Sequence, residues 1–438
     1  DALAIAIGNL HGKYVATPQL NIERLQEINN RNRLPLVLHG GSGTSFEDFK
    51  SCIHNGICKI NVATAIQIAV TNKLEKYFKT VSNPNYIDMK YQMEKPEHSR
   101  KGIISAGSWL VDTVKFIDKY PVSGNLVTID KIEIGLGGCA HNVLVDLARL
   151  STDMPLYAGG CIGTDANGDF VMNEITRYGI DSRYMYRLEH VPTSYTDVMS
   201  ETGGNASRTF FHFRGANACL GREHLSPINV PARIFHLGYL LLLDELDKKD
   251  SEYGIKAARV LHELQKKGYE TSVDVVSEES DRFREIMLPC LPYIDYLIIN
   301  EVEAGACCHT QLRDEKGKIS LESVKSTVGQ LLALGVNKVC AVHFPEGGYA
   351  ARKQGETCYI PSIPVDKKDI VSPVGAGDAF CAGMLYALHE NQSLRDAVIF
   401  ANTSARFNLR SATSTGGAPC LSELEHFIHL NYTNHEKK

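Results

Sequence analysis

The chain of 438 residues is longer than a single hydrophobic core normally fills, which favours two folded units. Its composition is that of a folded globular protein, and its net charge of −5 disfavours a nucleic-acid partner. No apolar run is as long as a bilayer requires, and the twelve cysteines include no Cys-x-x-Cys pair. We therefore predict a cytoplasmic protein with reduced thiols and no membrane or nucleic-acid partner.

Residues 1–97 alternate short apolar runs with helical patterns. The predicted strands are 2–7, 34–38 and 57–62, and the predicted helices are 22–29, 46–54 and 65–78. This alternation predicts a parallel sheet. Residues 83–100 are polar, contain two prolines and are typical of a linker. Because the sequence opens on Asp1 and enters a strand pattern at once, we expect it to be a fragment of a longer product.

A second unit is predicted over residues 98–438. It begins with strands at 102–106 and 126–134, followed by a glycine cluster and a helix at 142–150. Residues 194–200 and 207–213 flank a loose glycine-containing turn and predict a hairpin. Further strands are expected at 234–238, 270–275, 296–300 and 338–342. A hairpin beside repeated strand–helix units predicts a doubly wound sheet with a small β flap that can close over a pocket.

The most informative segment is a glycine-rich turn that leads into an apolar helix. Its small residues Gly375, Ala376 and Gly377 let the backbone approach an anion, and the helix start adds N–H groups and a positive dipole end. Asp378 follows at the mouth of the helix, where a carboxylate can accept a hydroxyl proton during attack on a phosphoryl group. For an isolated turn of this kind, an Asp that only caps its helix is the stronger reading.

Three further features accompany this turn. Asn300 and Glu303 follow a strand end, where Glu303 can hold Mg²⁺ through water and Asn300 can reach a phosphate. A glycine pair, Gly137 and Gly138, opens the helix that carries Asn142. Asp112 follows the first strand of the second unit and can accept hydrogen bonds from two hydroxyl groups. Each feature alone is unremarkable, but their order along the chain is informative.

Together these features resemble the ribokinase-like family of carbohydrate kinases, over residues 102 to about 428. The landmarks are Asp112, Gly137-Gly138 with Asn142, Gly163-x-Asp165-x-x-Gly168, Asn300-x-x-Glu303 and Gly375-Ala-Gly-Asp378. The resemblance implies a three-layer α/β/α sandwich with a small β lid, which uses ATP and Mg²⁺. One departure stands out, because Ser372-Pro373-Val374 occupies the place where the family usually has Asp-Thr and a third residue.

The resemblance also implies roles for individual residues. Asp378 is the expected base, and the amides of Gly375, Ala376 and Gly377 are the expected anion hole. The acceptor sugar is expected at Asp112, Gly137, Gly138 and Asn142, and Mg²⁺ and phosphate at Asn300 and Glu303. The adenine is expected between the segment from His343 to Gly348 and the helix that holds Asn402. The remaining histidines, among them His212 and His236, show no metal-ligand spacing and are expected to be structural.

Two histidines in the first unit follow successive strands, His11 beside Gly12 and His39 beside a Gly-Gly-Ser segment. This part resembles the C-terminal part of a class II ketose-bisphosphate aldolase, a zinc-dependent (β/α)₈ barrel. By that resemblance His11 and His39 match zinc ligands. Positions that match the ketose-phosphate site are Gly12, Gly40, Gly41, Ser42, Asn61, Val62, Ala63 and Thr64. Two histidines are too few for catalytic zinc and three strands cannot close a barrel, so we expect no aldolase activity from this partial barrel.

The favoured function is an ATP-dependent kinase that acts on a sugar or sugar phosphate. A kinase that makes a ketose bisphosphate and an aldolase that splits one catalyse consecutive steps, which favours a ketose phosphate as acceptor. Free hexoses, sugar acids and nucleosides remain open. The alternatives are a bifunctional enzyme with an active aldolase, if the chain is truncated, and a non-catalytic sugar-binding regulator, which the retained Asp378 disfavours. Kinases of this family often pair through their lids, so a homodimer is a further expectation without a diagnostic pattern in the sequence.

Overall fold

The computed structural model describes residues 3–5, 7, 19–39, 44–60, 100–150, 153–202, 208–276 and 282–433. The chain forms two compact units, Asp1–Ser99 and Arg100–Lys438. No helix within the described ranges is both long and apolar enough to cross a membrane.

The first unit contains a three-stranded parallel sheet in the order β1-β2-β3. Its described elements are β1 (Leu3–Ile5), α1 (Ile22–Arg31), β2 (Leu36–Leu38), α2 (Phe46–His54) and β3 (Ile57–Ile60). The side chains of Asn21 and Ser45 accept hydrogen bonds from first-turn amides and so begin the two helices. Leu25, Leu36 and Leu38 are fully buried in a separate small core. The helix predicted at 65–78 lies outside the described residues, and the partial barrel stays a prediction.

The second unit is built on a nine-stranded sheet in the order β18-β17-β16-β15-β14-β11-β4-β7-β8. In chain order these strands are β4 (Ile103–Gly107), β7 (Leu156–Gly163), β8 (Asp181–Leu188), β11 (Ile234–Leu240), β14 (Glu270–Val275), β15 (Tyr296–Asn300), β16 (Val339–Phe344), β17 (Gly347–Arg352) and β18 (Thr357–Pro361). Seven strands are mutually parallel, and β17 and β18 extend one edge in antiparallel fashion.

Helices cover both faces of this sheet, because successive residues of a strand point to opposite sides. Ile298 packs into one core and its neighbour Ile299 into the other. One face carries α5 (Cys139–Leu150), α6 (Ala166–Arg177), α12 (Ala376–His389), α13 (Leu394–Asn408) and α14 (Leu421–Ile428). The other carries α7 (Arg222–Leu225), α8 (Lys256–Lys266), α9 (Phe283–Cys290), α10 (Glu301–Cys308) and α11 (Leu321–Leu334). The predicted three-layer α/β/α sandwich is therefore confirmed.

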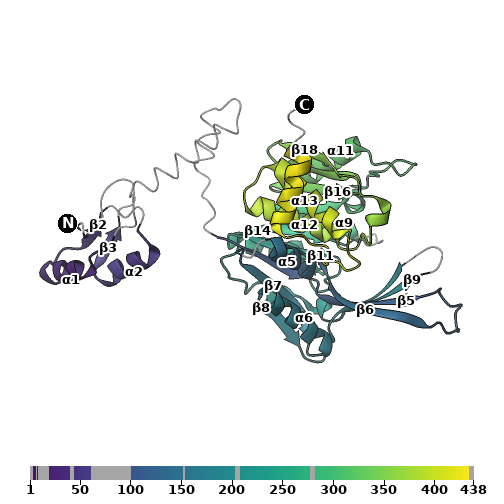
Figure 1. Ribbon diagram of the computed structural model, residues 1–438, viewed down its shortest axis with the longest axis horizontal. Helices are drawn as coiled ribbons and strands as arrows, with labels where there is room; N and C mark the ends of the chain where they lie inside the picture. The colour runs from purple at the N-terminus through teal and green to yellow at the C-terminus, as the bar shows by residue number, and fades with distance from the viewer. Residues whose placement is uncertain are drawn as a thin grey trace. The chain divides into compact units, whose positions relative to one another are not determined.

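A smaller four-stranded sheet, here called the lid, projects from the body of this unit (Figure 1). Its order is β10-β9-β5-β6, with β5 (Leu110–Ile117), β6 (Ile129–Gly137), β9 (Tyr195–Glu201) and β10 (Arg208–Phe213). The predicted hairpin is present as the antiparallel pair of β9 and β10. Strand β5 was not predicted, although it lies between β9 and β6 and is thus central to the lid. A two-stranded ribbon, β12 (Lys249–Asp250) and β13 (Gly254–Ile255), completes the described strands.

The strand order reverses at β4, which lies between β7 and β11. The chain runs outward from β4 to β7 and β8 and then returns to β11 on the other side. In open α/β sheets such a reversal leaves a crevice at the carboxyl ends of the strands, where ligands bind. Tyr239, Asp274 and Asn300 lie at or near the carboxyl ends of β11, β14 and β15. This edge of the sheet is therefore the place to look for a functional site.

Candidate functional site

The glycine-rich turn begins helix α12. Gly375 is its N-cap residue with a φ of 78°, and a Cβ at this position would lie 2.1 Å from the carbonyl oxygen of Ser414. Only glycine therefore fits without displacing the backbone. Asp378 lies in the first turn and is 4% exposed. The Ala376 N–H donates to the Pro373 carbonyl oxygen at 3.2 Å, so one of the three amides of the predicted anion hole has a partner within the turn.

The carboxylate of Asp378 is held by donors from two other elements. Asn142 Nδ2, on α5, donates to Asp378 Oδ2 at 2.6 Å, and the Tyr239 hydroxyl, on β11, donates to the same oxygen at 3.3 Å. Burial raises the pKa of Asp378, while hydrogen bonds from Asn142, Cys139 and Tyr239 act to lower it. The result is a carboxylate with a raised pKa, which is suited to accept a proton.

The orientation of the Asn142 amide follows from its contacts with Asp378 and Ser414. Its Oδ1 accepts a hydrogen bond from the Ser414 hydroxyl at 2.9 Å and lies 2.9 Å from His141 Nδ1. An ionised carboxylate only accepts hydrogen bonds, so the amide nitrogen Nδ2 must face Asp378 and Oδ1 faces Ser414. Asn142 thereby joins the start of α5 to the start of α12.

Asp112 lies on lid strand β5, directly above the glycine pair. A Cβ at Gly137 would lie 2.2 Å from Asp112 Oδ2, so this carboxylate occupies space that only glycine leaves open. The pKa of Asp112 is raised to about 6, mainly by burial and also by the charge of Asp378, while a hydrogen bond from Thr196 acts to lower it. Asp112, Thr196 and His212 stand opposite one another on β5, β9 and β10, and Thr196 Oγ1 lies 3.1 Å from His212 Nδ1.

Asn300, the last residue of β15, and Glu303 together form the cap of helix α10. Asn300 Oδ1 accepts from the amides of Val302 and Glu303, and Glu303 Oε2 accepts from the Asn300 N–H at 2.9 Å. Burial, together with the charges of Glu303 and Asp378, raises the pKa of Asp274 well above its ordinary range. The Glu303 side chain thus belongs to the same acidic group as Asp274 and Asp378.

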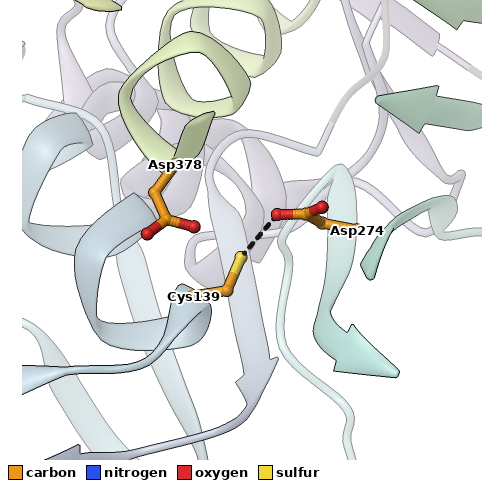
Figure 2. Close-up of side chains that lie close together, drawn as sticks. All are labelled: Cys139, Asp274 and Asp378. Atoms are coloured by element: carbon orange, nitrogen blue, oxygen red, sulfur yellow. Dashed lines mark hydrogen bonds between the residues drawn. The ribbon is translucent and has the colours of Figure 1, made fainter. Parts of the chain in front are cut away.

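Figure 2 shows the Cys139 thiol pointing to the carboxylate of Asp274, with the carboxylate of Asp378 beside it. One ligand atom from each of the three residues lies within 4.8 Å of the others, and all three side chains are buried. No Lys or Arg within the described ranges lies at ion-pair distance from Asp112, Asp274 or Asp378. Like charges buried together in this way require a cation or protonation.

The residues predicted to contact adenine lie close to one another. His343 stands opposite Gly348 in the β16–β17 pair. A Cβ at Gly348 would lie 2.9 Å from the Phe380 ring and 3.1 Å from Asn402 Oδ1, and the His343 and Phe380 rings are 4.8 Å apart. His343 and Gly348 therefore lie against the ring of Phe380, two residues beyond Asp378, and Asn402 lies beside Gly348.

Residues 101–420 match the profile of the pfkB family of carbohydrate kinases. The chain belongs to this family. Residues 1–107 of the same chain match class II fructose-bisphosphate aldolase. Both resemblances predicted from the motifs are therefore confirmed, as is the enzyme class of carbohydrate kinase.

Solved structures similar to this carbohydrate kinase share its fold. Ribokinase of Arabidopsis thaliana, solved with ribose and ATP, is 20% identical with a TM-score of 0.62, and the match covers 75% of this chain and 99% of that one. Ribokinase of Thermotoga maritima is 21% identical with a TM-score of 0.60, over 75% and 99% of the two chains. The nucleoside kinase of Methanocaldococcus jannaschii is 18% identical with a TM-score of 0.57, over 76% and 99%. These matches confirm the ribokinase-like fold.

The landmark around Asp165 is explained by local structure in this kinase. Asp165 is the N-cap of α6, and its carboxylate accepts hydrogen bonds from the Gly168 amide and from the Thr193 amide and hydroxyl. A Cβ at Gly168 would lie 2.3 Å from the Gly163 carbonyl oxygen. This motif therefore fixes the start of α6 and the segment before β9.

Sequence reasoning missed three residues of the kinase site: Tyr239, Asp274 and Cys139. Tyr239 has a φ of 60°, next to an irregular register between Leu237 and Leu240. That conformation turns its hydroxyl toward Asp378 and leaves no mark in the sequence pattern. Asp274 had a usable signal, since a carboxylate near the end of an apolar strand lies at the ligand-binding edge. Cys139 follows the glycine pair directly.

Most residues matched to the aldolase site lie outside the described residues, namely His11, Gly12, Gly40, Gly41, Ser42, Asn61, Val62, Ala63 and Thr64. His39 is described; it follows β2, and its backbone N–H donates to the Ile5 carbonyl oxygen at 3.3 Å. Within the described ranges no group of three metal-ligating side chains includes His39. The zinc site stays a prediction.

Tyr239→Phe removes a donor to Asp378 and should raise the pKa of that carboxyl further. We expect the acid limb of the pH–rate profile for phosphoryl transfer to move to higher pH, because a more basic Asp378 is protonated earlier as the pH falls. The measurement is kcat/KM against pH with the best acceptor. Tyr184→Phe, remote from Asp378, serves as the control. An acid limb at the wild-type position would contradict the assigned contact.

Proposed function

We propose that this carbohydrate kinase transfers the γ-phosphoryl group of ATP to a hydroxyl group of a sugar phosphate, with a ketose phosphate as the preferred acceptor. The observation that carries the proposal is the buried carboxylate of Asp378 in the first turn of α12, held by Asn142 and Tyr239 at the ligand-binding edge of the sheet.

In the proposed mechanism Asp378 accepts the proton of the attacking hydroxyl. Its raised pKa makes it a better base than an ordinary carboxylate, and the fixed Asn142 amide keeps one carboxylate oxygen in place. The start of α12 presents main-chain N–H groups and the positive end of the helix dipole to the migrating phosphoryl group. Asp112 and Asn142 orient the acceptor so that one hydroxyl faces Asp378.

The acidic residues at the strand ends fit a hard divalent cation. Asp274 and Glu303 offer carboxylate oxygens, which Mg²⁺ prefers. The pKa of Asp274 is raised first by burial and then by the negative charges of Glu303 and Asp378, and a bound cation would offset both. Mg²⁺ bound together with ATP neutralises the phosphates and the developing charge. We place the adenine between His343, Gly348 and Asn402. The solved Arabidopsis ribokinase, which contains ribose and ATP, has the same fold and supports this choice of nucleotide.

Arg208 supports an anionic acceptor. It stands four residues before His212 on β10, so both side chains lie on the lid face that also carries Asp112. Its Nη1 donates to Ser372 Oγ at 3.3 Å, and Ser372, 1% exposed, lies three residues before Gly375. No carboxylate among the described residues pairs with this guanidinium, whose fork of N–H donors suits a phosphate.

The attached segment points to the same acceptor class. Residues 1–107 match class II fructose-bisphosphate aldolase, and a kinase that phosphorylates a ketose phosphate makes the kind of bisphosphate that such an aldolase cleaves. We propose aldolase activity, with Zn²⁺ at His11 and His39, only for a longer chain that supplies the further zinc ligands. A nucleoside kinase with the same fold keeps nucleosides in the acceptor screen.

Asp378→Asn keeps the size of the side chain but removes the base. We expect kcat to fall by about 10²- to 10⁴-fold, the usual contribution of a general base, with ATP affinity nearly unchanged. The measurement is coupled ATP consumption with the best acceptor, alongside direct nucleotide binding. Asp369→Asn, an exposed carboxylate ahead of the same turn, is the control. A variant that retains near wild-type turnover would exclude Asp378 as the base.

Arg208→Met should raise KM for phosphorylated acceptors by about ten- to a hundredfold, the value of a hydrogen bond to a charged group. KM for neutral sugars should stay the same, because they offer no anion to the guanidinium. Lys131→Met, another cation of the lid, is the control. Equal losses for neutral and phosphorylated acceptors, or a change confined to KM for ATP, would contradict the role of Arg208.

We further propose that the kinase forms a homodimer through the outer face of the lid. Ile134 is 62% exposed and Phe211 is 53% exposed, and they stand at the two ends of one row across the sheet, with Thr113 and Asp197 between them. Tyr195 and Phe213 lie in the next row, with their rings in contact. Apolar side chains gathered on one face of a small sheet are typical of an interface. Asp112 and Arg208 lie on the inner face of the lid, so a dimer formed through the outer face leaves the proposed acceptor site open.

Phe211→Lys should convert the dimer to a monomer, because it places a charge in the apolar face. Sedimentation velocity gives the mass directly. Phe210→Lys is the matched control, since Phe210 is equally exposed but points to the opposite face of the same strand. A monomeric wild-type protein, or a dimer that survives Phe211→Lys, would disprove pairing through this face.

A further inference from the structure

His141, in the first turn of α5, contacts the residue that holds Asp378. It is 4% exposed, and its Nδ1 lies 2.9 Å from Asn142 Oδ1. Consecutive residues of a helix do not normally face each other, so this contact requires the imidazole to be turned toward its neighbour. His141 is thus one side chain removed from the carboxylate of Asp378.

The His141 ring is held in turn by Trp109. The two rings meet edge to face, with centroids 6.0 Å apart and an interplanar angle of 72°. Trp109 is buried, and its Nε1 donates to the Gly159 carbonyl oxygen at 2.9 Å. A Cβ at Gly160 would lie 2.4 Å from Trp109 Cδ1, so the indole fills space that only glycine leaves open. Because β7 fixes the indole, the imidazole that packs against it is restrained as well.

The hydrogen bonds of Asn142 determine which nitrogen of His141 carries a proton. Asn142 Nδ2 donates to Asp378 Oδ2 at 2.6 Å, and the atom that faces His141 is the carbonyl oxygen Oδ1. A carbonyl oxygen only accepts, so Nδ1 of His141 must be the protonated nitrogen. Burial lowers the pKa of His141 to about 4, while the hydrogen bond to Asn142 acts to raise it. At neutral pH the ring therefore carries a single proton, which lies on Nδ1.

His141 is a more constant donor to Asn142 Oδ1 than Ser414 is. The Ser414 hydroxyl has one proton and two acceptors in reach, Asn142 Oδ1 at 2.9 Å and the Leu136 carbonyl oxygen at 3.1 Å. Within the described ranges the Nδ1–H of His141 has Asn142 Oδ1 as its one acceptor. If the Asn142 amide turned over, its NH₂ group would meet this N–H, and its oxygen would meet the carboxylate of Asp378. Both contacts are repulsive, so His141 keeps the amide from turning.

We propose that His141 is a positioning residue of the kinase: its Nδ1–H fixes the Asn142 amide, which in turn holds the carboxylate of Asp378. The inference rests on the proposed role of Asp378 as base. No proton moves along this series of contacts, because His141 and Asn142 act only through hydrogen bonds. A carboxylate held by a fixed amide stays within reach of the acceptor hydroxyl, so loss of His141 should lower turnover and leave nucleotide binding unchanged.

His141→Phe keeps a ring against Trp109 but removes the donor to Asn142. We expect kcat to fall by about three- to tenfold, the value of one hydrogen bond, with KM for ATP unchanged. His141→Asn should restore most of the loss, because its amide nitrogen takes the place of Nδ1. His262→Phe is the matched control, since His262 also packs edge-on against aromatic rings but lies on α8, at the opposite face of the sheet.

A double-mutant cycle tests whether His141 acts through Asn142. In the Asn142→Ala background His141→Phe should have no further effect on kcat, because the amide that it orients is absent. The same fold loss in both backgrounds would overturn the inference. So would wild-type kcat in His141→Phe, or a His141→Asn variant that is as slow as His141→Phe.

The position of the proton can be measured without reference to turnover. In protein labelled with ¹⁵N-histidine, the long-range ¹H–¹⁵N spectrum should show Nδ1 as the protonated nitrogen of His141 at neutral pH. The signals of His141 are assigned by their absence in His141→Asn. A proton on Nε2 would overturn the inference, even if His141→Phe does not fold. A proton on Nδ1 combined with full turnover in Asp378→Asn would refute the base while the contact that fixes Asn142 stands.

Discussion

The site depends on the burial of several carboxylates beside one another at the carboxyl edge of the sheet. Burial raises the pKa values of Asp112, Asp274 and Asp378, and the charge of Asp378 adds to the rise at the other two. No Lys or Arg within the described ranges pairs with any of the three. Neutral donors, the Asn142 amide and the Tyr239 hydroxyl, stabilise Asp378 without neutralising it. Such a site is basic enough to take a proton, but it repels a polyphosphate unless a cation accompanies it. The proposed use of Mg²⁺ with ATP follows from this excess of negative charge, which no basic side chain of the described ranges offsets.

Glycine makes this convergence sterically feasible. The Asp112 carboxylate fills the space beside Gly137, α5 approaches β11 over Gly238, and the turn before Asp378 approaches Ser414 at Gly375. In each case a Cβ would fall at 2.2, 2.8 or 2.1 Å from another atom, which is closer than real contacts allow. Because glycine has no side chain, the lid and the helices α5 and α12 can approach one another closely at these three positions. A substitution at these glycines acts on the geometry of the site and not only on stability.

Much of the fold and part of the site could be predicted from local patterns in the sequence. The strand at 270–275 was predicted from its apolar run, and the helix after Gly375 from the small residues of the turn and the apolar segment that follows. Strand β5 was missed because its alternation is interrupted by polar residues of the lid. Tyr239 could not have been found, since its place depends on a φ of 60° at a register irregularity that only the packed sheet imposes. For the aldolase-like segment the motif residues lie outside the described ranges, apart from His39, so its predictions stand on sequence alone.

Cys139 places one more neutral donor beside the buried carboxylates. As a neutral thiol it can donate its single proton to Asp274 or to Asp378, and so it supplements the Asn142 amide and the Tyr239 hydroxyl, which donate to Asp378. Oxygen ligands from Asp274 and Glu303 suit a hard cation on the nucleotide side. A hydroxyl at position 139 could make the same hydrogen bond, so the contribution of Cys139 that the site requires is its proton and its place at the start of α5.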